Sequence, residues 1–212
     1  MPLTDAPRPA WLAPLSDPRN EVILTAAFDV FLEKGLHRAT MLEIATLAKV
    51  SKETLYARFD NKEGLFYALL AWGAGKSGID ADSFVAAADW DPVKALEDHA
   101  VRCLAKMMHP ESIGVHRIVV GEATRMPELA RVFDEFTCQA ALAPLYRIAD
   151  ALNETGAACI DDNAAFGDAF LGLVRGNLHH QVTIGVMPDP SDEEIEAHAR
   201  RAAQLLLRAF AP

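Results

Sequence analysis

The sequence has few cysteines and no obvious set of metal ligands. Cys103, Cys138 and Cys159 are the only cysteines in 212 residues, and they stand far apart. An odd, widely spaced set fits neither a disulfide framework nor a zinc site. His179 and His180 are adjacent, so on a helix their side chains point about 100° apart and do not converge on one ion. We therefore expect buried, reduced thiols, no metal and no cofactor.

Long apolar runs and export signals are also missing. No stretch approaches the roughly 18 uninterrupted apolar residues of a membrane span. The N-terminus lacks the basic-then-apolar order of a signal peptide. These absences predict a cytoplasmic protein without membrane contact. Five prolines within the first eighteen residues predict a flexible tail over residues 1–16 that resists regular structure.

The residue sets typical of enzymes are absent as well. The sequence contains no recognisable Ser/His/Asp arrangement, no glycine-rich phosphate loop and no carboxylate–histidine helix pair of the di-iron kind. We therefore predict that the protein is not an enzyme.

The charge of the chain is unevenly distributed. The formal net charge is −10, which at first argues against a nucleic-acid partner. Residues 1–75, however, hold eight basic against nine acidic side chains, whereas residues 76–212 hold twelve against 21. A basic face on the N-terminal part is therefore compatible with the overall charge.

The apolar pattern is helical throughout. With 51% hydrophobic residues the chain can bury a sizeable core. No segment shows the sustained alternation of strands, so the sequence predicts an all-α fold. Pro144 is expected to kink or divide one of the later helices. Those later helices are expected near residues 91–108, 112–124, 127–153, 161–184 and 191–210.

The first third of the chain is marked by helix-capping residues. Thr40 and Glu43 form a capping box, in which the hydroxyl binds a backbone N–H and the carboxylate reaches back to the cap. Gly35 is expected to end the first helix, because a left-handed C-cap favours glycine. The expected N-caps are Asp17, Thr40, Ser51 and Asn61.

Residues 52–59, KETLYARF, place their few apolar side chains on one side of a short helix. At about 100° per residue, Leu55 and Phe59 fall together and the polar side chains lie elsewhere. Two short helices joined by a tight turn, the second with a polar outer face, form a helix-turn-helix. Its second helix fits a DNA major groove. The alternative is a three-helix packing unit that never contacts nucleic acid.

Each outward residue type suits a particular DNA contact. Thr54 and Ala57 fit a thymine methyl group, and Thr54 also suits a base edge. Arg58 suits a guanine or a phosphate. Glu53 suits cytosine N4, or it repels phosphate from wrong registers.

From Asn20 to about Phe66 the chain resembles the DNA-binding domain of the TetR family of bacterial transcriptional repressors. The matching stretches are ILTAAFDVFLEKG, TMLEIATLAKVS, KETLYARF and NKEGLF. The resemblance implies phosphate contacts from Thr40, Lys62 and the Tyr56 hydroxyl. It places five further residues on the groove-facing helix: Lys52, Glu53, Thr54, Ala57 and Arg58. The sequence departs from the family at Lys49, where glycine is common, and at Glu53, where a small residue is common.

The resemblance also implies a C-terminal body that encloses a small, largely apolar effector and forms a homodimer. Glu122–Arg125, before MPELARVF, resembles a segment of one C-terminal subgroup of the family. The candidates for the effector pocket are Trp72, His99, Cys103, Met107, His116, Phe133 and Phe136. The candidates for the dimer interface are Phe166, Phe170, Leu173, Val174, Ile195, Ala199 and Leu206. For both sets the alternative is ordinary internal packing.

We therefore expect a helix-turn-helix domain over residues 17–66 and an effector-binding and dimerisation domain over residues 67–212. The predicted function is a ligand-responsive repressor that binds a palindromic DNA operator as a homodimer. The alternative is a DNA-associated protein-interaction module that does not respond to an effector.

Overall fold

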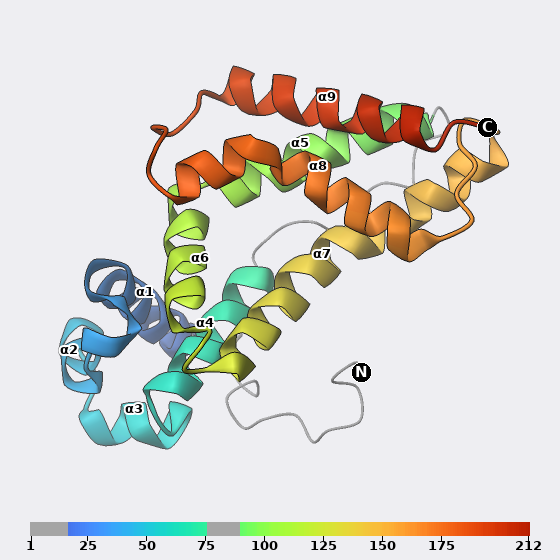
Figure 1. The fold of residues 1–212 in the computed structure, drawn as a ribbon. Coiled ribbons are helices and arrows are strands. Elements are labelled where there is room, and N and C mark those ends of the chain that lie inside the picture. Colours follow the sequence, from blue (N-terminus) through green and yellow to red (C-terminus); the bar gives the residue numbers. More distant parts are fainter. Residues whose placement is uncertain (1–16, 76–89) are drawn as a thin grey trace. The chain divides into compact units, whose positions relative to one another are not determined.

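The computed structural model describes residues 17–75 and 90–212, and every regular element in these two ranges is a helix (Figure 1). This confirms the all-α prediction; the tail over residues 1–16 lies outside the described residues. None of the described helices is long and apolar enough to cross a membrane. The helices are α1 (Pro18–Arg38), α2 (Met41–Leu47), α3 (Lys52–Phe59), α4 (Lys62–Gly75), α5 (Pro92–Met108), α6 (Pro110–Glu122), α7 (Pro127–Glu154), α8 (Asn163–Thr183) and α9 (Asp192–Ala209).

The chain forms two compact units. The described part of the first, here called the head, comprises residues 17–75 and 118–136. The described part of the second, here called the body, comprises residues 90–117 and 137–212.

The head is built around α1 and α4, against which the shorter α2 and α3 pack. Phe31 of α1 meets Phe66 of α4 edge to face, with ring centroids 5.1 Å apart. Leu55 and Phe59 of α3 are fully buried beneath their helix. Because these are the two core side chains of α3, its remaining surface is left for polar groups.

In the body, α5, α8 and α9 pack against one another around a shared apolar core. Arg200 of α9 reaches across to α5, where it donates to Glu97 at 3.1 Å. Apolar residues from the C-terminal part of α7, including Leu145 and Ile148, complete the core.

Two helices are interrupted at glycine rather than at proline. Gly35 in α1 has φ +72° and Gly176 in α8 has φ +49°, and both leave helical geometry. Gly35 therefore takes the positive φ that the sequence predicted. Pro144 was expected to kink or divide its helix, and it does not divide it, because α7 runs from Pro127 to Glu154 with Pro144 inside.

The turn between α2 and α3 is closed by a Schellman arrangement, a common helix ending. The Val50 N–H donates to the Ala45 carbonyl at 3.0 Å and the Lys49 N–H to the Thr46 carbonyl at 3.2 Å. This geometry places Lys49 at φ +55°, a conformation that favours glycine. Lys49 thus bears the left-handed backbone expected at this departure from the family pattern.

Replacement of Lys49 tests this strain. Lys49→Gly and Lys49→Ala both remove the charge, but only glycine lacks the Cβ that opposes a positive φ. We expect Lys49→Gly to be more stable to urea than Lys49→Ala by about 1 kcal/mol. Equal midpoints and equal slopes for the two variants would show that the turn bears no such strain.

Candidate nucleic-acid interface

The start of α2 carries the predicted capping box. The Glu43 N–H donates to Thr40 Oγ1 at 3.2 Å, and the Thr40 N–H donates to Glu43 Oε2 at 3.1 Å. The Thr40 hydroxyl also donates to Glu43 Oε2, at 2.9 Å. Lys34 pairs with the other carboxylate oxygen, and its hydrogen bond is the main reason that the pKa of Glu43 is lowered. The Thr40 hydroxyl therefore already has a partner, which a phosphate would have to replace.

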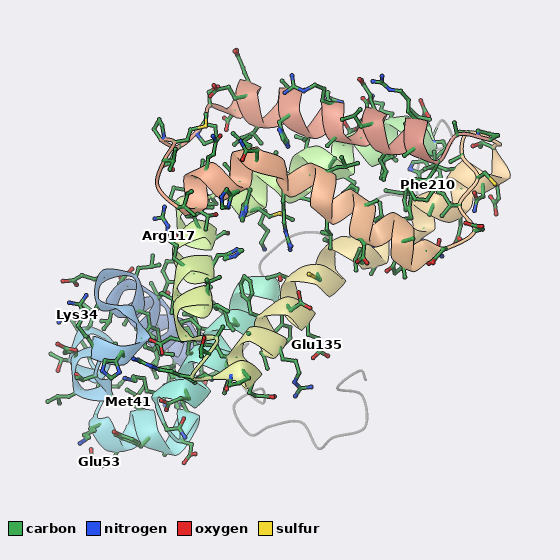
Figure 2. All side chains as sticks on the ribbon, viewed as in Figure 1. Lys34, Met41, Glu53, Arg117, Glu135 and Phe210 are labelled. Carbon is green, nitrogen blue, oxygen red and sulfur yellow. The ribbon has the colours of Figure 1, made fainter. Side chains whose placement is uncertain are left out.

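The start of α3 is fixed by Ser51. Its Oγ accepts from the Thr54 N–H at 3.1 Å and lies 3.0 Å from Thr54 Oγ1. Ser51 also helps to lower the pKa of Glu53, after the backbone N–H of Glu53 itself. Glu53, labelled in Figure 2, points away from α1 and α2. An ionised carboxylate at a helix start is favoured by the helix dipole.

Five of the residues that the sequence assigns to DNA contacts are exposed on α3. Lys52 Nζ lies 5.5 Å from the centre of the Tyr56 ring, a cation–π distance. This contact brings an ammonium group and a phenol together, and both can bind phosphate. The residues exposed on this face, here called the outer face, are Lys52, Glu53, Thr54, Tyr56 and Ala57.

Arg58 is bonded within the head. Its guanidinium donates to Asp17 Oδ2 at 2.9 Å and to Asn20 Oδ1 at 2.5 Å. Asp17 is the N-cap of α1, and it also accepts from the Arg19 N–H at 2.9 Å. Arg58 therefore ties α3 to the start of α1, and its side chain is only 24% exposed. In this arrangement its guanidinium is not free to bond a base, because it is already bonded within the head.

Lys62 is also engaged inside the head. Its ammonium donates to the carbonyls of His37 and Ala39, at 3.0 and 3.1 Å. These carbonyls lie at the end of α1, where cations are favoured. At the start of α4 the expected cap is Asn61, whose side chain accepts from the Gly64 N–H at 2.7 Å. Lys62 thus closes the connection between α1 and α2, and a phosphate contact would have to share its ammonium.

The effector-pocket candidates are divided between the two units. Trp72, Phe133 and Phe136 belong to the head and are half-buried there. The other four belong to the body: His99, Cys103, Met107 and His116.

His99 and Cys103 form a polar contact within the core of the body. His99 Nε2 lies 2.8 Å from the Ala141 carbonyl and 3.5 Å from Cys103 Sγ, and its ring stacks on Phe170 with centroids 5.3 Å apart. Burial lowers the pKa of His99 to about 4 and raises the pKa of Cys103 to about 12. Both side chains are therefore neutral, and the geometry is that of a structural contact.

His116 of α6 faces His179 of α8, with ring centroids 5.2 Å apart and planes at 49°. Burial is the first cause that lowers the pKa of both histidines, and for His179 the value falls to about 4. The charge of Arg175 lowers both pKa values further. In the sequence, His179 and His180 were considered as metal ligands and rejected. No local pattern predicted that His179 would contact His116 of α6.

The dimer candidates lie mostly inside the protomer. Leu173 alone among them is half-buried, and the remaining six are buried in the core that α8 and α9 share with α5. The six are Phe166, Phe170, Val174, Ile195, Ala199 and Leu206. Side chains that are buried in the core of their own protomer are not available to contact a second protomer. A dimer would therefore form through other residues of these helices.

A capped helix-turn-helix with an exposed polar outer face, joined to an all-helical body, defines a DNA-binding transcriptional regulator. Residues 23–69 match the family described as bacterial regulatory proteins of the tetR family. Residues 94–212, more than half of the chain, match the C-terminal domain of AefR-like transcriptional repressors. The chain belongs to the TetR family.

Similar proteins agree with this placement over most of the chain. The HTH-type transcriptional regulator YvkB of Bacillus subtilis is 26% identical over 181 residues, 84% of this chain and 92% of that protein. A TetR-family regulator from Mesorhizobium loti superposes with a TM-score of 0.79 at 25% identity, covering 92% of this chain and 97% of that one. The flavonoid-responsive regulator FrrA superposes with a TM-score of 0.71 at 29% identity, over the same shares.

Substitution of Arg58 distinguishes two roles for this residue. Either it only holds α3 to the start of α1, or it also contacts one DNA base directly. Arg58→Lys keeps the charge but loses the fork, and Asp17→Asn keeps an N-cap residue but loses the ion pair. We expect each to weaken binding to every single-base variant of a bound DNA site by a similar factor, at most roughly fivefold. The measurement is fluorescence anisotropy across the variant set. A loss confined to one base position would show that Arg58 reads that base.

His99 predicts a pH dependence of stability. Its pKa is about 4 in the folded body, whereas an unfolded chain takes up the proton near pH 6.5. Below pH 6.5 the unfolded state therefore binds more protons, and stability falls until about pH 4. The full loss is up to about 3 kcal/mol. Above pH 6.5 this contribution is constant.

Urea unfolding between pH 7.5 and 5 measures this dependence. His179, with its similar pKa, adds to the same slope, so variants are needed to separate the two. His99→Gln should reduce the slope, and His109→Gln, at an exposed position, should not. An unchanged slope in His99→Gln would contradict the assignment.

Proposed function

We propose that the protein is a ligand-responsive repressor that binds a palindromic operator as a homodimer. The observation that carries this proposal is the outer face of α3. Two buried side chains, Leu55 and Phe59, hold the helix on the head, and the opposite side presents hydroxyl, ammonium and methyl groups. Such a set suits phosphates and base edges in a major groove.

Within this proposal the exposed residues have separate tasks. Lys52 and the Tyr56 hydroxyl bind phosphate and fix the register of α3 in the groove. Thr54 and Ala57 face base edges, and Ala57 can make only apolar contact, as with a thymine methyl. Glu53 accepts from cytosine N4 or disfavours registers that bring phosphate close. Thr40 and Lys62 reach phosphate only by sharing groups that already close the head.

We further propose that two parts of the chain have different functions. Residues 17–66 bind DNA, and residues 67–212 bind the effector and a second copy. The sign of regulation, repression, is supported by the match of residues 94–212 to AefR-like repressors. The structural relative named for its response to flavonoids supports a small-molecule effector.

For the dimer, we propose the outward sides of α8 and α9. A Cβ placed on Gly172 would meet no atom within 4 Å, so this side of α8 is open to a close approach. On α9, Leu205 is 47% exposed. Since helix-turn-helix dimers read half-sites about one helical turn apart, two copies are needed for a palindrome.

DNA binding tests the proposal directly. We expect two protomers to bind a fragment from upstream of the protein's own gene roughly a thousandfold more tightly than random DNA. The logarithm of the affinity should fall linearly with the logarithm of the salt concentration. Tyr56→Phe, which removes only a hydroxyl, should weaken specific and random DNA alike by roughly fivefold. Absence of specific binding or of a salt slope rejects the proposal.

The alternative, a DNA-associated interaction module without an effector, makes a different prediction. It requires specific DNA binding that no small molecule reverses. Titration of small molecules into the protein–operator complex therefore separates the two functions, with the anisotropy of the labelled operator as the signal.

A further inference from the structure

The side of α3 that lies opposite its buried side chains is formed by three small or acidic residues. At about 100° per residue, Ala57 stands directly opposite the midpoint between Leu55 and Phe59, the two buried residues of the helix. Glu53 and Thr54 flank Ala57, and all three are exposed. These three residues, here called the central patch, are therefore the part of the outer face that projects furthest from the head.

The basic side chains of α3 lie to either side of the central patch and are engaged there. Arg58 donates to Asp17 and Asn20, and the Lys52 ammonium lies 5.5 Å from the centre of the Tyr56 ring. Proteins usually contact guanine through Arg or Lys and adenine through Asn or Gln. Residues 52–59, all of which the structure describes, contain no Asn or Gln. The central patch therefore lacks the side chains that bind purines with two hydrogen bonds.

Two methyl groups are available on the central patch. Thr54 Oγ1 lies 3.0 Å from Ser51 Oγ, which also accepts from the Thr54 N–H at 3.1 Å. Because the Thr54 hydroxyl is bonded to the helix cap, its methyl group remains for contact with another molecule. Ala57, three residues later, offers only a methyl group. In the major groove the apolar partner of such groups is the C5 methyl of thymine.

The third member of the central patch, Glu53, is an acceptor only. Its own backbone N–H and then Ser51 lower the pKa of its carboxyl group, which is therefore ionised near pH 7. The amino groups that base pairs present in the major groove are cytosine N4 and adenine N6. In adenine the acceptor N7 stands beside the amino group and repels the second carboxylate oxygen, whereas cytosine has a C–H there. Glu53 therefore favours cytosine.

We propose that the central patch makes α3 specific for pyrimidines, with Thr54 and Ala57 against thymine methyl groups and Glu53 against cytosine N4. Side chains three or four positions apart on a helix have Cβ atoms about 5–6 Å apart, which is less than two base-pair steps of roughly 3.4 Å. The contacted pyrimidines therefore belong to neighbouring base pairs of each half-site. This inference rests on the proposed operator binding, and it names the class of base that the operator presents to α3.

Deoxyuridine substitution tests the methyl contacts with the unaltered protein. The full-length protein is first used to select bound duplexes from a random-sequence library. Each thymine of the selected site is then replaced singly by deoxyuridine, which keeps the O4 acceptor but lacks the C5 methyl. We expect a loss of affinity of roughly fourfold, about that of one buried methyl group, at one or two thymines of each half-site. Fluorescence anisotropy of the labelled duplexes gives the affinities.

Two pairs of variants assign the bases to residues. Thr54→Ser removes the methyl group and keeps the hydroxyl, so it should abolish the deoxyuridine loss at one thymine, whereas Thr54→Val should retain it. Glu53→Gln should lower the preference for cytosine over adenine at one position by roughly tenfold, because a glutamine amide matches adenine. Glu33→Gln, which removes the same charge from an exposed position of α1, should leave every base preference unchanged.

Specific binding and base preference are measured separately. Selection of no specific site rejects the proposed operator binding together with this inference. A specific site at which no thymine shows the deoxyuridine loss rejects this inference alone. The inference is also overturned if Thr54→Ser leaves every such loss in place, or if Glu53→Gln changes no base preference. The deoxyuridine measurement uses the unaltered protein, so its result holds even where a variant folds poorly.

Discussion

The guanidinium of Arg58 holds α3 to Asp17, the first residue that the structure describes. Its bonds to Asp17 and Asn20 join the end of α3 to the start of α1. Since α3 contributes only Leu55 and Phe59 to the core, apolar packing alone leaves its orientation weakly specified. A bonded cation at the end of so short a helix supplies the missing constraint. The exposed face of α3 can then be polar without loss of position.

Polar side chains also form hydrogen bonds at other helix ends of the head. Thr40, Glu43 and Lys34 close the start of α2, and Lys62 closes the end of α1. Polar side chains at such ends satisfy backbone groups that the helices leave unpaired. They are the same chemical types that bind phosphate, so sequence reasoning assigns them to DNA before the structure shows their partners in the protein. On α3, by contrast, the polar side chains of the outer face remain exposed.

In the body two buried histidines lie in different surroundings. His99 is bonded to the Ala141 carbonyl and stacked on Phe170. His179 is nearly as buried, and its ring centroid lies 5.2 Å from that of His116. Burial is the main reason that the pKa of each falls to about 4, so both are neutral near pH 7.

The sequence by itself determined the helical class, the caps at Asp17, Thr40, Ser51 and Asn61, the left-handed turn at Lys49 and the outward polar face of α3. These follow from local rules, namely side-chain period, backbone conformation and bonds between near neighbours. Only the tertiary structure decided that Arg58 and Lys62 bond to other residues of the head. It also decided that α7 continues through Pro144 whereas α8 is interrupted at Gly176. Finally, it decided that the apolar stripes of α8 and α9 are buried in the core of their own protomer. Each of these depends on which distant residue lies opposite: Asp17 is 41 positions from Arg58, and no local pattern records a contact of that range.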